Sequence, residues 1–240
     1  MENIKKNRYF INVTLLGDSQ VGKTTIKDRL LGKQFNINTI TTTCPPYKEY
    51  FNISNSKKIP NSDIFINIWD TAGQEKYRSQ CAGAIKMADI ILFIRDHLHD
   101  NLGEENSNSW IATAENSNSL QSEKVIKIFC LNKTDLIDEN TKNEIREVLT
   151  NISSNYPSSK VFVISSKNDN DIQNLKNDII FFAEDLTIKA IKSYNHEVNA
   201  ILFGPSMVGK TTLIHRIIYD YYQESTILTL KLEKTSQQIL

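Results

Sequence analysis

The sequence predicts an α/β protein of three layers, in which a six-stranded, mostly parallel sheet carries helices on both faces. Two observations lead to this fold class. Short apolar runs rich in β-branched residues alternate with stretches of helical periodicity, and most runs are far enough apart for a crossover helix. The expected strands are Tyr9–Leu16, Tyr47–Ile53, Ile64–Trp69, Asp89–Arg95, Val125–Leu131 and Lys160–Ile164.

The second and third of these strands are expected to form a hairpin. The residues between them, 54–63, are polar and contain Pro60, a composition typical of a loop. The other connections are long enough to carry helices that return the chain to the start of a parallel strand. The hairpin therefore supplies the antiparallel part of a mostly parallel sheet.

The last helix has the clearest pattern. It is predicted from Asp171 to about Tyr194, with Lys189 and Lys192 favourably placed near its C-terminal end. Either Asp169 or Asp171 is expected to cap its N-terminus. Its apolar stripe recurs at spacings of three and four residues and comprises Ile172, Leu175, Ile179, Ala183, Leu186 and Ala190.

The helix expected before Val125 has the weakest pattern. Its region repeats Glu-Asn-Ser-Asn-Ser at 105–109 and 115–119, and Asn and Ser side chains compete with helical backbone hydrogen bonds. We therefore expect a poor or broken helix here. Trp110, between the two copies, is interpreted as a packing residue of that helix.

Composition narrows the class of protein. The 240 residues carry 28 basic and 28 acidic side chains, and this balance gives no reason to expect a nucleic-acid polymer as partner. The longest apolar runs, such as 90–94, are too short to cross a bilayer, and the first residues lack the apolar core of a signal peptide. The three cysteines, Cys44, Cys81 and Cys130, are widely spaced. A reduced, cytoplasmic protein is therefore expected.

The first motif with specific chemistry follows the first strand. Residues 17–24 read Gly-Asp-Ser-Gln-Val-Gly-Lys-Thr, which fits the phosphate-binding pattern Gly-x-x-x-x-Gly-Lys-Ser/Thr. Small residues let backbone N–H groups close around phosphate oxygens, and the N-terminus of the next helix favours an anion. Lys23 is expected to neutralise the terminal phosphates, and the Thr24 hydroxyl to bind Mg²⁺. The motif predicts the three-layer fold of P-loop nucleoside triphosphatases.

A second motif lies at the end of the third strand. Residues 69–75 read Trp-Asp-Thr-Ala-Gly-Gln-Glu. An acidic residue at a strand end, Asp70, can hold the hydration shell of Mg²⁺. Gly73 would let its backbone N–H approach a γ-phosphate, and Gln74 could orient an attacking water. Because this motif follows a phosphate loop, a simple turn cap is the weaker interpretation.

Two further motifs indicate which base is bound. Residues 132–135, Asn-Lys-Thr-Asp, follow the fifth strand, and the Asp135 carboxylate can accept two parallel hydrogen bonds from the N1–H and 2-amino groups of guanine. Adenine lacks that donor pair, so unpaired groups would penalise it. Residues 165–167, Ser-Ser-Lys, follow the sixth strand and could brace the base through backbone N–H groups. The pattern therefore favours GTP over ATP.

With four motifs in this order, each after a strand, the sequence closely resembles the Ras superfamily of small GTPases over residues 9–194. The phosphate loop, Trp69 before Asp70 and the run Glu-Lys-Tyr-Arg at 75–78 are most similar to the Rab branch. The resemblance implies a switch between GDP and GTP that uses Mg²⁺. It also implies partners of three kinds, namely an exchange factor, a GTPase-activating protein and effector proteins.

The expected catalytic residues are Gln74 and Lys23. The expected metal ligands are Thr24, Thr42 and, through water, Asp70. The residues expected to bind the nucleotide are Gly17, Asp18, Ser19, Gln20, Val21, Gly22, Lys23, Thr24, Thr25, Asp70, Gly73, Asn132, Lys133, Asp135, Ser165, Ser166 and Lys167.

The sequence also departs from the family pattern. Gln20 stands where Rab proteins usually carry a small residue. Ungapped spacing selects Thr42 as the metal-binding threonine of the first switch, with Thr39, Thr41 and Thr43 as alternatives. The prolines at 45–46 remove two backbone donors after it. The chain ends without a cysteine for a lipid anchor, so membrane association would run through partners.

The C-terminal region repeats the start of the chain. Residues 12–31 and 199–218 align without gaps, with ten of the twenty positions identical. The predicted organisation is therefore a tail at 1–8, a small GTPase domain at 9–194, and a partial second P-loop domain with a β-α-β pattern at 195–240. The second phosphate loop is expected to use Gly204, Gly209, Lys210 and Thr211.

Three interpretations of this second loop stay open. About 40 residues cannot bury a parallel sheet of their own. The chain is then a fragment of a tandem GTPase, a degenerate duplication that packs on the first domain, or, as the weakest alternative, a protein with a working second site. The motifs for Mg²⁺ coordination and guanine recognition do not recur within 195–240.

The leading functional hypothesis is a GTP-binding molecular switch of Rab-like character in intracellular trafficking or signalling. Such an enzyme, a GTPase, converts GTP to GDP and phosphate slowly, because catalysis by positioning needs an arginine from a partner. The alternative is a hydrolytically weak, nucleotide-dependent binding module of a longer tandem-GTPase protein. Gln20, the two prolines and the partial repeat motivate the alternative, while Asp135 argues against an ATP-dependent enzyme.

Overall fold

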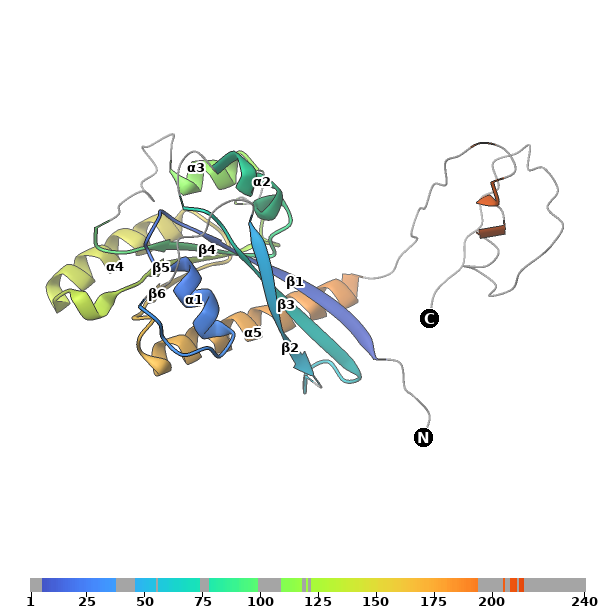
Figure 1. Cartoon of the computed structure of the whole chain (residues 1–240), viewed down its shortest axis with the longest axis horizontal. Coiled ribbons are helices and arrows are strands. Elements are labelled where there is room, and N and C mark those ends of the chain that lie inside the picture. The colour runs from blue at the N-terminus through green and yellow to red at the C-terminus, as the bar shows by residue number, and fades with distance from the viewer. Residues whose placement is uncertain are drawn as a thin grey trace. The chain divides into compact units, whose positions relative to one another are not determined.

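The computed structural model describes residues 6–37, 46–54, 56–73, 78–98, 109–117, 120, 122–193, 205, 208–210 and 212–213. They form the predicted α/β fold, with one six-stranded sheet of order β2-β3-β1-β4-β5-β6 (Figure 1). Only β2 and β3 pair in antiparallel fashion, and the other neighbours are parallel. The strands are β1 (Asn7–Leu16), β2 (Tyr47–Ser54), β3 (Ser62–Asp70), β4 (Ile90–Arg95), β5 (Ile126–Leu131) and β6 (Ser159–Val163).

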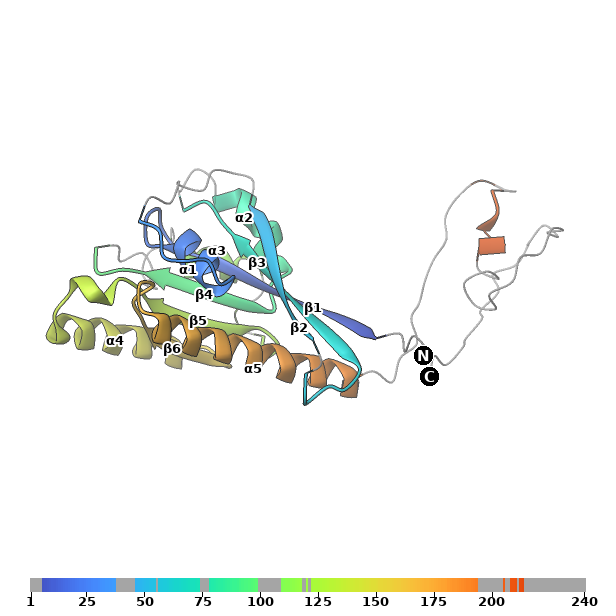
Figure 2. The same ribbon diagram turned by 60° about the horizontal axis from the view of Figure 1, so that its bottom comes forward.

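The helices divide between the two faces of the sheet. They are α1 (Lys23–Leu30), α2 (Arg78–Lys86), α3 (Trp110–Glu115), α4 (Glu139–Ser154) and α5 (Asp169–Ser193), with a short 3₁₀ helix η2 (Thr134–Leu136). Apolar residues of α1 and α5 pack in one core cluster, and those of α2, α3 and α4 in the other. Figure 2 shows α5 running along the sheet. Among the described helices, none has both the length and the apolarity to cross a bilayer.

The central strands are apolar on both faces because helices cover them on both sides. Every residue of β4 and of β5 is buried. Phe93 and Phe129 stack across these neighbours with ring centroids 5.1 Å apart. On the opposite face, Ile172, Leu175 and Ile179 of α5 contribute the predicted stripe. The carboxyl ends of the parallel strands therefore meet at one edge, held by two packed layers of helices.

The boundaries of the strands and of α5 lie within two residues of the predictions. Two details differ from the sequence analysis. The first strand begins at Asn7, inside the predicted tail, because Asn7 pairs in register with Ser62 of β3. The predicted cap of α5 is wrong. Asn168, rather than Asp169 or Asp171, caps it, since its Oδ1 accepts the backbone N–H of Asn170 at 2.9 Å.

The Asn/Ser-rich region carries the short helix expected there. The six residues of α3 begin after Ser109, whose side chain accepts the backbone N–H of Ala112. Trp110 is fully buried, as a packing residue should be. Packing against the rest of the domain stabilises this helix, although its residues have a poor intrinsic helix propensity.

The C-terminal repeat lies largely outside the described residues. The chain divides into two compact units, Met1–Lys189 and Ala190–Leu240. Within the second unit the structure describes 190–193, which end α5, and then Pro205, 208–210 and 212–213, while Gly204 and Thr211 lie outside the described residues. The predicted domain boundary at 195 and the β-α-β pattern beyond it stay predictions.

Candidate functional site

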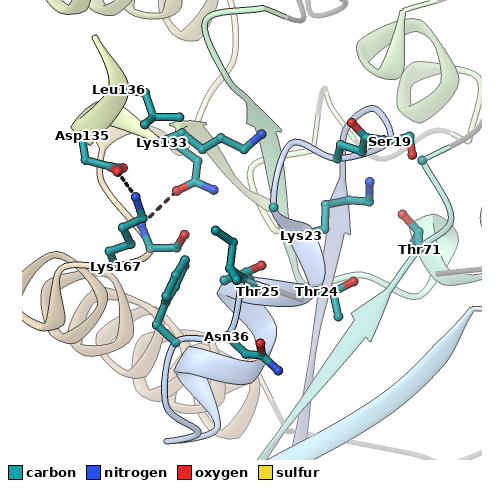
Figure 3. A pocket seen from close by; sticks show the side chains of 17 residues that line it. Ser19, Lys23, Thr24, Thr25, Asn36, Thr71, Lys133, Asp135, Leu136 and Lys167 are labelled. Carbon is teal, nitrogen blue, oxygen red and sulfur yellow. Dashed lines mark hydrogen bonds and ion pairs between the residues drawn. The ribbon is translucent and has the colours of Figure 1, made fainter. Parts of the chain in front are cut away.

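A cavity of about 480 Å³ lies where the carboxyl ends of the strands meet. Figure 3 shows the side chains that line it converging from α1, from the end of β3 and from the loops after β5 and β6. Its walls are formed by Ser19, Gln20, Gly22, Lys23, Thr24, Thr25, Phe35, Asn36, Ile37, Thr71, Gly73, Asn132, Lys133, Asp135, Leu136, Ser166 and Lys167. Motifs up to 150 residues apart in the sequence therefore share one cavity.

Most predicted site residues thus line the cavity, five others lie beside it, and two lie outside the described residues. Gly17, Asp18, Val21, Asp70 and Ser165 do not line the cavity, and each contacts a residue that does or adjoins one. Thr42 and Gln74 lie outside the described residues. Their predicted roles in metal binding and water positioning stay predictions.

The phosphate loop wraps around the ammonium group of Lys23. Lys23 Nζ donates to the carbonyl oxygens of Gly17 at 2.8 Å and Asp18 at 2.6 Å. Burial lowers the pKa of Lys23 to about 8, although the charges of Asp70 and Asp18 partly oppose that effect. A cation held in a buried ring of backbone is a binding group for an anion, because an anion would restore the stability of its charge.

Gly17 shows why the loop begins with glycine. Its φ is +148°, a backbone conformation that L side chains rarely adopt. A Cβ at this position would also lie 2.1 Å from the carbonyl oxygen of Ile94 in β4. Gln20 is the exception in the loop, since it takes a left-handed φ of 69° although it is not glycine.

The end of β3 contacts the same loop. A Cβ on Gly73 would lie 2.4 Å from the backbone carbon of Asp18 and 2.4 Å from the backbone nitrogen of Ser19. Only glycine permits so close an approach. Thr71 fixes the strand end to β1, because its hydroxyl donates to the carbonyl oxygen of Leu15 at 2.6 Å.

Thr24 and Asp70 supply oxygen ligands of the kind that Mg²⁺ prefers. The Thr24 hydroxyl donates to Asp70 Oδ2 at 2.8 Å, and Asp70 is fully buried. In the described part of the chain, no group of three or more His, Cys, Asp or Glu side chains could hold a metal by protein atoms alone. The two oxygen groups, 2.8 Å apart, fit a hydrated Mg²⁺ that is shared with the phosphates of a nucleotide.

Asn132 joins the two ends of the cavity. Its Nδ2 donates to the carbonyl oxygen of Val21 in the phosphate loop at 2.9 Å, and its Oδ1 accepts the backbone N–H of Ser166 at 3.1 Å. The side chain is fully buried. Asn132, in the third motif, therefore connects the first and fourth motifs by hydrogen bonds.

Asp135 is held at the opposite end of the cavity from Lys23 (Figure 3). Its Oδ1 accepts the Ser165 hydroxyl at 2.7 Å, and its Oδ2 accepts Lys167 Nζ at 2.5 Å. Partial burial raises the pKa of Asp135, but the hydrogen bonds from Lys167 and Ser165 more than offset it, so the pKa lies below its ordinary value. The group is therefore an ionised acceptor at neutral pH.

The backbone N–H groups of the fourth motif are engaged within the protein. Ser165 N–H donates to Asp171 Oδ2 at 2.8 Å, and Lys167 N–H donates to the Ser165 hydroxyl at 3.3 Å. With Ser166 N–H on Asn132, all three support the loop itself. The expectation that they brace a base stays a prediction.

Several residues of the site have no motif. Trp110 of α3 donates its indole N–H to Asp18 Oδ1 at 3.0 Å, so it anchors the phosphate loop as well as packing.

Arg29 of α1 donates to the carbonyl oxygens of Ser166 at 3.2 Å and Lys33 at 2.9 Å. Phe35 lies under Lys167, with Nζ 5.8 Å from the ring centroid. Phe35 belongs to no motif. In the sequence it is a single aromatic residue after a helix, which does not by itself predict a place in the site.

Comparison with known proteins gives the family. The family described as Roc, Ras of Complex, Roc, domain of DAPkinase, matches residues 12–135, more than half of the chain. That segment includes the phosphate loop, the end of β3 and the Asn132–Asp135 motif.

Individual curated relatives are Rab proteins and a similar yeast protein. The chain is 30% identical over 141 residues to Ras-related protein Rab-27B of Rattus norvegicus, a match of 57% of this chain and 63% of the relative. It is 30% identical over 131 residues to Rab-17 of Mus musculus, covering 55% and 57%. It is 32% identical over 135 residues to GTP-binding protein ypt2 of Schizosaccharomyces pombe, covering 56% and 63%.

The matches span less than two thirds of these relatives' own lengths. The family match nevertheless agrees with the fold and includes three of the motifs that meet at the cavity. The chain therefore belongs to the Roc family of Ras-like domains, and so to the Ras superfamily of small GTPases, with Rab-like relatives.

Proposed function

We propose that this chain is a guanine-nucleotide switch that binds GDP and GTP together with Mg²⁺. The observation that carries the proposal is the single cavity with Lys23 and the phosphate loop at one end and the ionised Asp135 at the other. The cation suits a polyphosphate, and the carboxylate suits a base with two adjacent N–H donors. A guanine nucleotide carries both at opposite ends.

The phosphate end uses the loop as a rigid cradle. Lys23 exchanges its two carbonyl partners for phosphate oxygens and neutralises their charge. Gly73, already in contact with the loop backbone, lies where a γ-phosphate would be sensed. This close contact supports a role for Gly73 in distinguishing GTP from GDP.

Mg²⁺ would be held by Thr24, with Asp70 acting through water, and Thr42 as the predicted ligand from the first switch. The ion supplies neutralisation of negative charge on the phosphates. Asp70 and Thr24 are already joined by a 2.8 Å hydrogen bond, so the protein brings both groups to the same place.

Hydrolysis is the proposed slow step. Gln74 orients an attacking water, while Lys23 stabilises charge on the phosphates, and no arginine is assigned to the cavity wall in the described residues. Positioning without such a cation predicts a low intrinsic rate that a GTPase-activating protein raises. Exchange factors and effectors are the other proposed partners. The proposed setting is the cytoplasm, in intracellular trafficking or signalling.

The test of base recognition exchanges the acceptor for a donor. Asp135→Asn places an NH₂ donor against the 2-amino group of guanine, so the affinity for GDP should fall by about 100-fold. One hydrogen bond to a charged group is lost, and the remaining one is to a neutral carbonyl oxygen. The variant should gain affinity for xanthosine diphosphate, whose 2-carbonyl accepts that group. Asp138→Asn is the matched control, because Asp138 is the exposed N-cap of α4. Tight binding of ATP by the wild-type protein, or unchanged GDP affinity in Asp135→Asn, would refute the assignment.

A second candidate function is a nucleotide-dependent binding module with weak hydrolysis. Gln20 favours it, because this residue of the phosphate loop has a left-handed backbone conformation and lines the cavity. A single-turnover assay with Mg²⁺ separates the two. Slow conversion of bound GTP that stops in Gln74→Leu supports the GTPase, and stable GTP in the wild-type protein supports the binding module.

A further inference from the structure

Lys27 is a buried cation in a helix face that should be apolar. It lies in α1 between Ile26 and Leu30, both fully buried, and it is itself only 1% exposed. The internal repeat carries Ile214 at the equivalent position. An aliphatic residue therefore suits this part of the motif, and burial of an ammonium group in its place has a free-energy cost that needs an explanation.

Three carboxylates surround the ammonium group. Lys27 Nζ lies 2.8 Å from Glu49 Oε1 in β2, 3.3 Å from Asp28 Oδ1, and 4.0 Å from Asp70 Oδ2 at the end of β3. A buried lysine keeps its charge when it is paired in this way. The structure thus fixes a positive charge between the first helix and the two strands of the hairpin.

One of these carboxylates belongs to the proposed metal site. Asp70 Oδ2, the atom that faces Lys27, also accepts the Thr24 hydroxyl at 2.8 Å. Asp70 is fully buried, so little water screens the interaction between its carboxylate and Lys27. The Lys27 ammonium group therefore lies close to Asp70 Oδ2, the oxygen through which Mg²⁺ would be held.

Lys33 shows that Lys27 is not needed merely to pair Glu49. Lys33 Nζ lies 3.1 Å from Glu49 Oε2 and 2.9 Å from Asp28 Oδ1, so it contacts two of the same carboxylates. Its side chain is half exposed, whereas that of Lys27 is 2% exposed. What distinguishes Lys27 is its approach to Asp70.

We propose that Lys27 is a residue that weakens Mg²⁺ binding and so makes GDP release sensitive to the Mg²⁺ concentration. The ammonium group lies 4.0 Å from Asp70 Oδ2, so it repels a divalent cation that is held beside this oxygen. This inference rests on the proposed function, since the metal is shared with a bound nucleotide.

The experiment measures the release of a fluorescent GDP analogue from the full chain across a series of free Mg²⁺ concentrations. The readout is the Mg²⁺ concentration at which release is half suppressed. Lys27→Met should lower that midpoint by about tenfold, because it removes the repulsive charge near Asp70. Lys27→Arg keeps the charge and should keep the wild-type midpoint. Lys33→Met, the exposed control, should change the midpoint by less than about twofold, because solvent screens its charge.

The outcomes separate this inference from a structural role and from the proposed function. An unchanged midpoint in Lys27→Met, or faster release at every Mg²⁺ concentration including saturation, overturns it. If Lys27→Met does not fold, Lys27→Gln removes the charge while keeping a hydrogen-bond donor for Glu49, and it must show the lower midpoint. A wild-type protein that binds no GDP at any Mg²⁺ concentration refutes the proposed function and this inference together, whereas wild-type release that depends on Mg²⁺ leaves only this inference at risk.

Discussion

At Gly73 the end of β3 passes so close to the phosphate loop that no side chain fits. The two nearest atoms to an added Cβ, at 2.4 Å, are backbone atoms of Asp18 and Ser19, so the loop itself would have to move. Gly73→Ala is therefore expected to lower the melting temperature. It should also lower GTP affinity by at least about tenfold and GDP affinity by less, since Gly73 is the proposed contact of the γ-phosphate, which GDP lacks.

The control for this substitution is Gly83→Ala in α2. A Cβ on Gly83 meets nothing within 4 Å, and alanine stabilises a helix relative to glycine by about 1 kcal/mol. That variant should be at least as stable as the wild-type protein and bind both nucleotides normally. Equal losses of GTP and GDP affinity in Gly73→Ala would contradict its part in sensing the third phosphate.

Gln20 is the second residue whose backbone decides the outcome. A left-handed φ of 69° costs an L-residue other than glycine about 1–2 kcal/mol. Gln20→Gly removes that cost, partly offset by greater freedom of the unfolded chain, so the free energy of unfolding should rise by up to about 1 kcal/mol. Ser19→Gly adds the same freedom without relieving a positive φ and should destabilise. Urea unfolding of both variants measures the difference, and a loss of stability in both would show that Gln20 is not strained.

At the scale of elements, one hydrogen bond connects α3 to the phosphate loop. Trp110→Phe keeps an aromatic ring in the core but removes the N–H that binds Asp18 Oδ1 at 3.0 Å. The free energy of unfolding should fall by about 2–4 kcal/mol, from the lost bond to a carboxylate and the residual space. Nucleotide affinity should fall as well, because Asp18 belongs to the loop that holds Lys23.

Trp69→Phe is the matched control for Trp110→Phe. Trp69 also donates its indole N–H, but its partner is Asn12 Oδ1 of β1, at 3.2 Å, and not a residue of the phosphate loop. Stability should fall by about 1 kcal/mol, the usual effect of one neutral hydrogen bond, and nucleotide affinity should stay unchanged. If both variants lose nucleotide affinity to the same degree, α3 has no special role in the loop.

The elements were predictable where one local pattern decides the structure. The buried runs of β4 and β5 and the apolar stripe of α5 follow from strand and helix periodicity, and the cavity follows from motifs that end strands. The cap of α5 was not predictable, because Asn168, Asp169 and Asp171 all suit that position. Asp171 instead holds the Ser165 backbone.

The contacts missed by sequence reasoning join residues that are distant along the chain. Arg29 contacts the Ser166 loop, 137 positions away, and no periodic pattern encodes such a pairing. The burial of Lys27 could not be predicted for the same reason, since a lysine in a short amphipathic helix normally faces solvent. Lys27 is buried because residues of β2 and β3 lie beside α1.

At the scale of the whole molecule, the described part of the second phosphate loop repeats local features of the first. Lys210 Nζ donates to the carbonyl oxygen of Pro205 at 2.6 Å, as Lys23 does to Asp18. Gly209 and Gly22 both have a positive φ, of 86° and 98°. The carbonyl oxygen of each glycine accepts the backbone N–H of the residue four positions later, at 2.9 Å in both loops. The described residues of the second loop therefore share the local geometry of the first.

Shared loop geometry does not by itself provide affinity for a nucleotide. The first loop acts with Asp70, Asn132 and Asp135, whereas the motifs that contain them do not recur in residues 195–240. Without a base-recognition group and a metal carboxylate, phosphate contacts alone would leave binding weak. We therefore expect one GDP per chain by titration calorimetry. Lys23→Ala should abolish this binding, and Lys210→Ala should leave its stoichiometry and affinity unchanged. Two GDP molecules per chain, with one lost in Lys210→Ala, would establish the second loop as a working site.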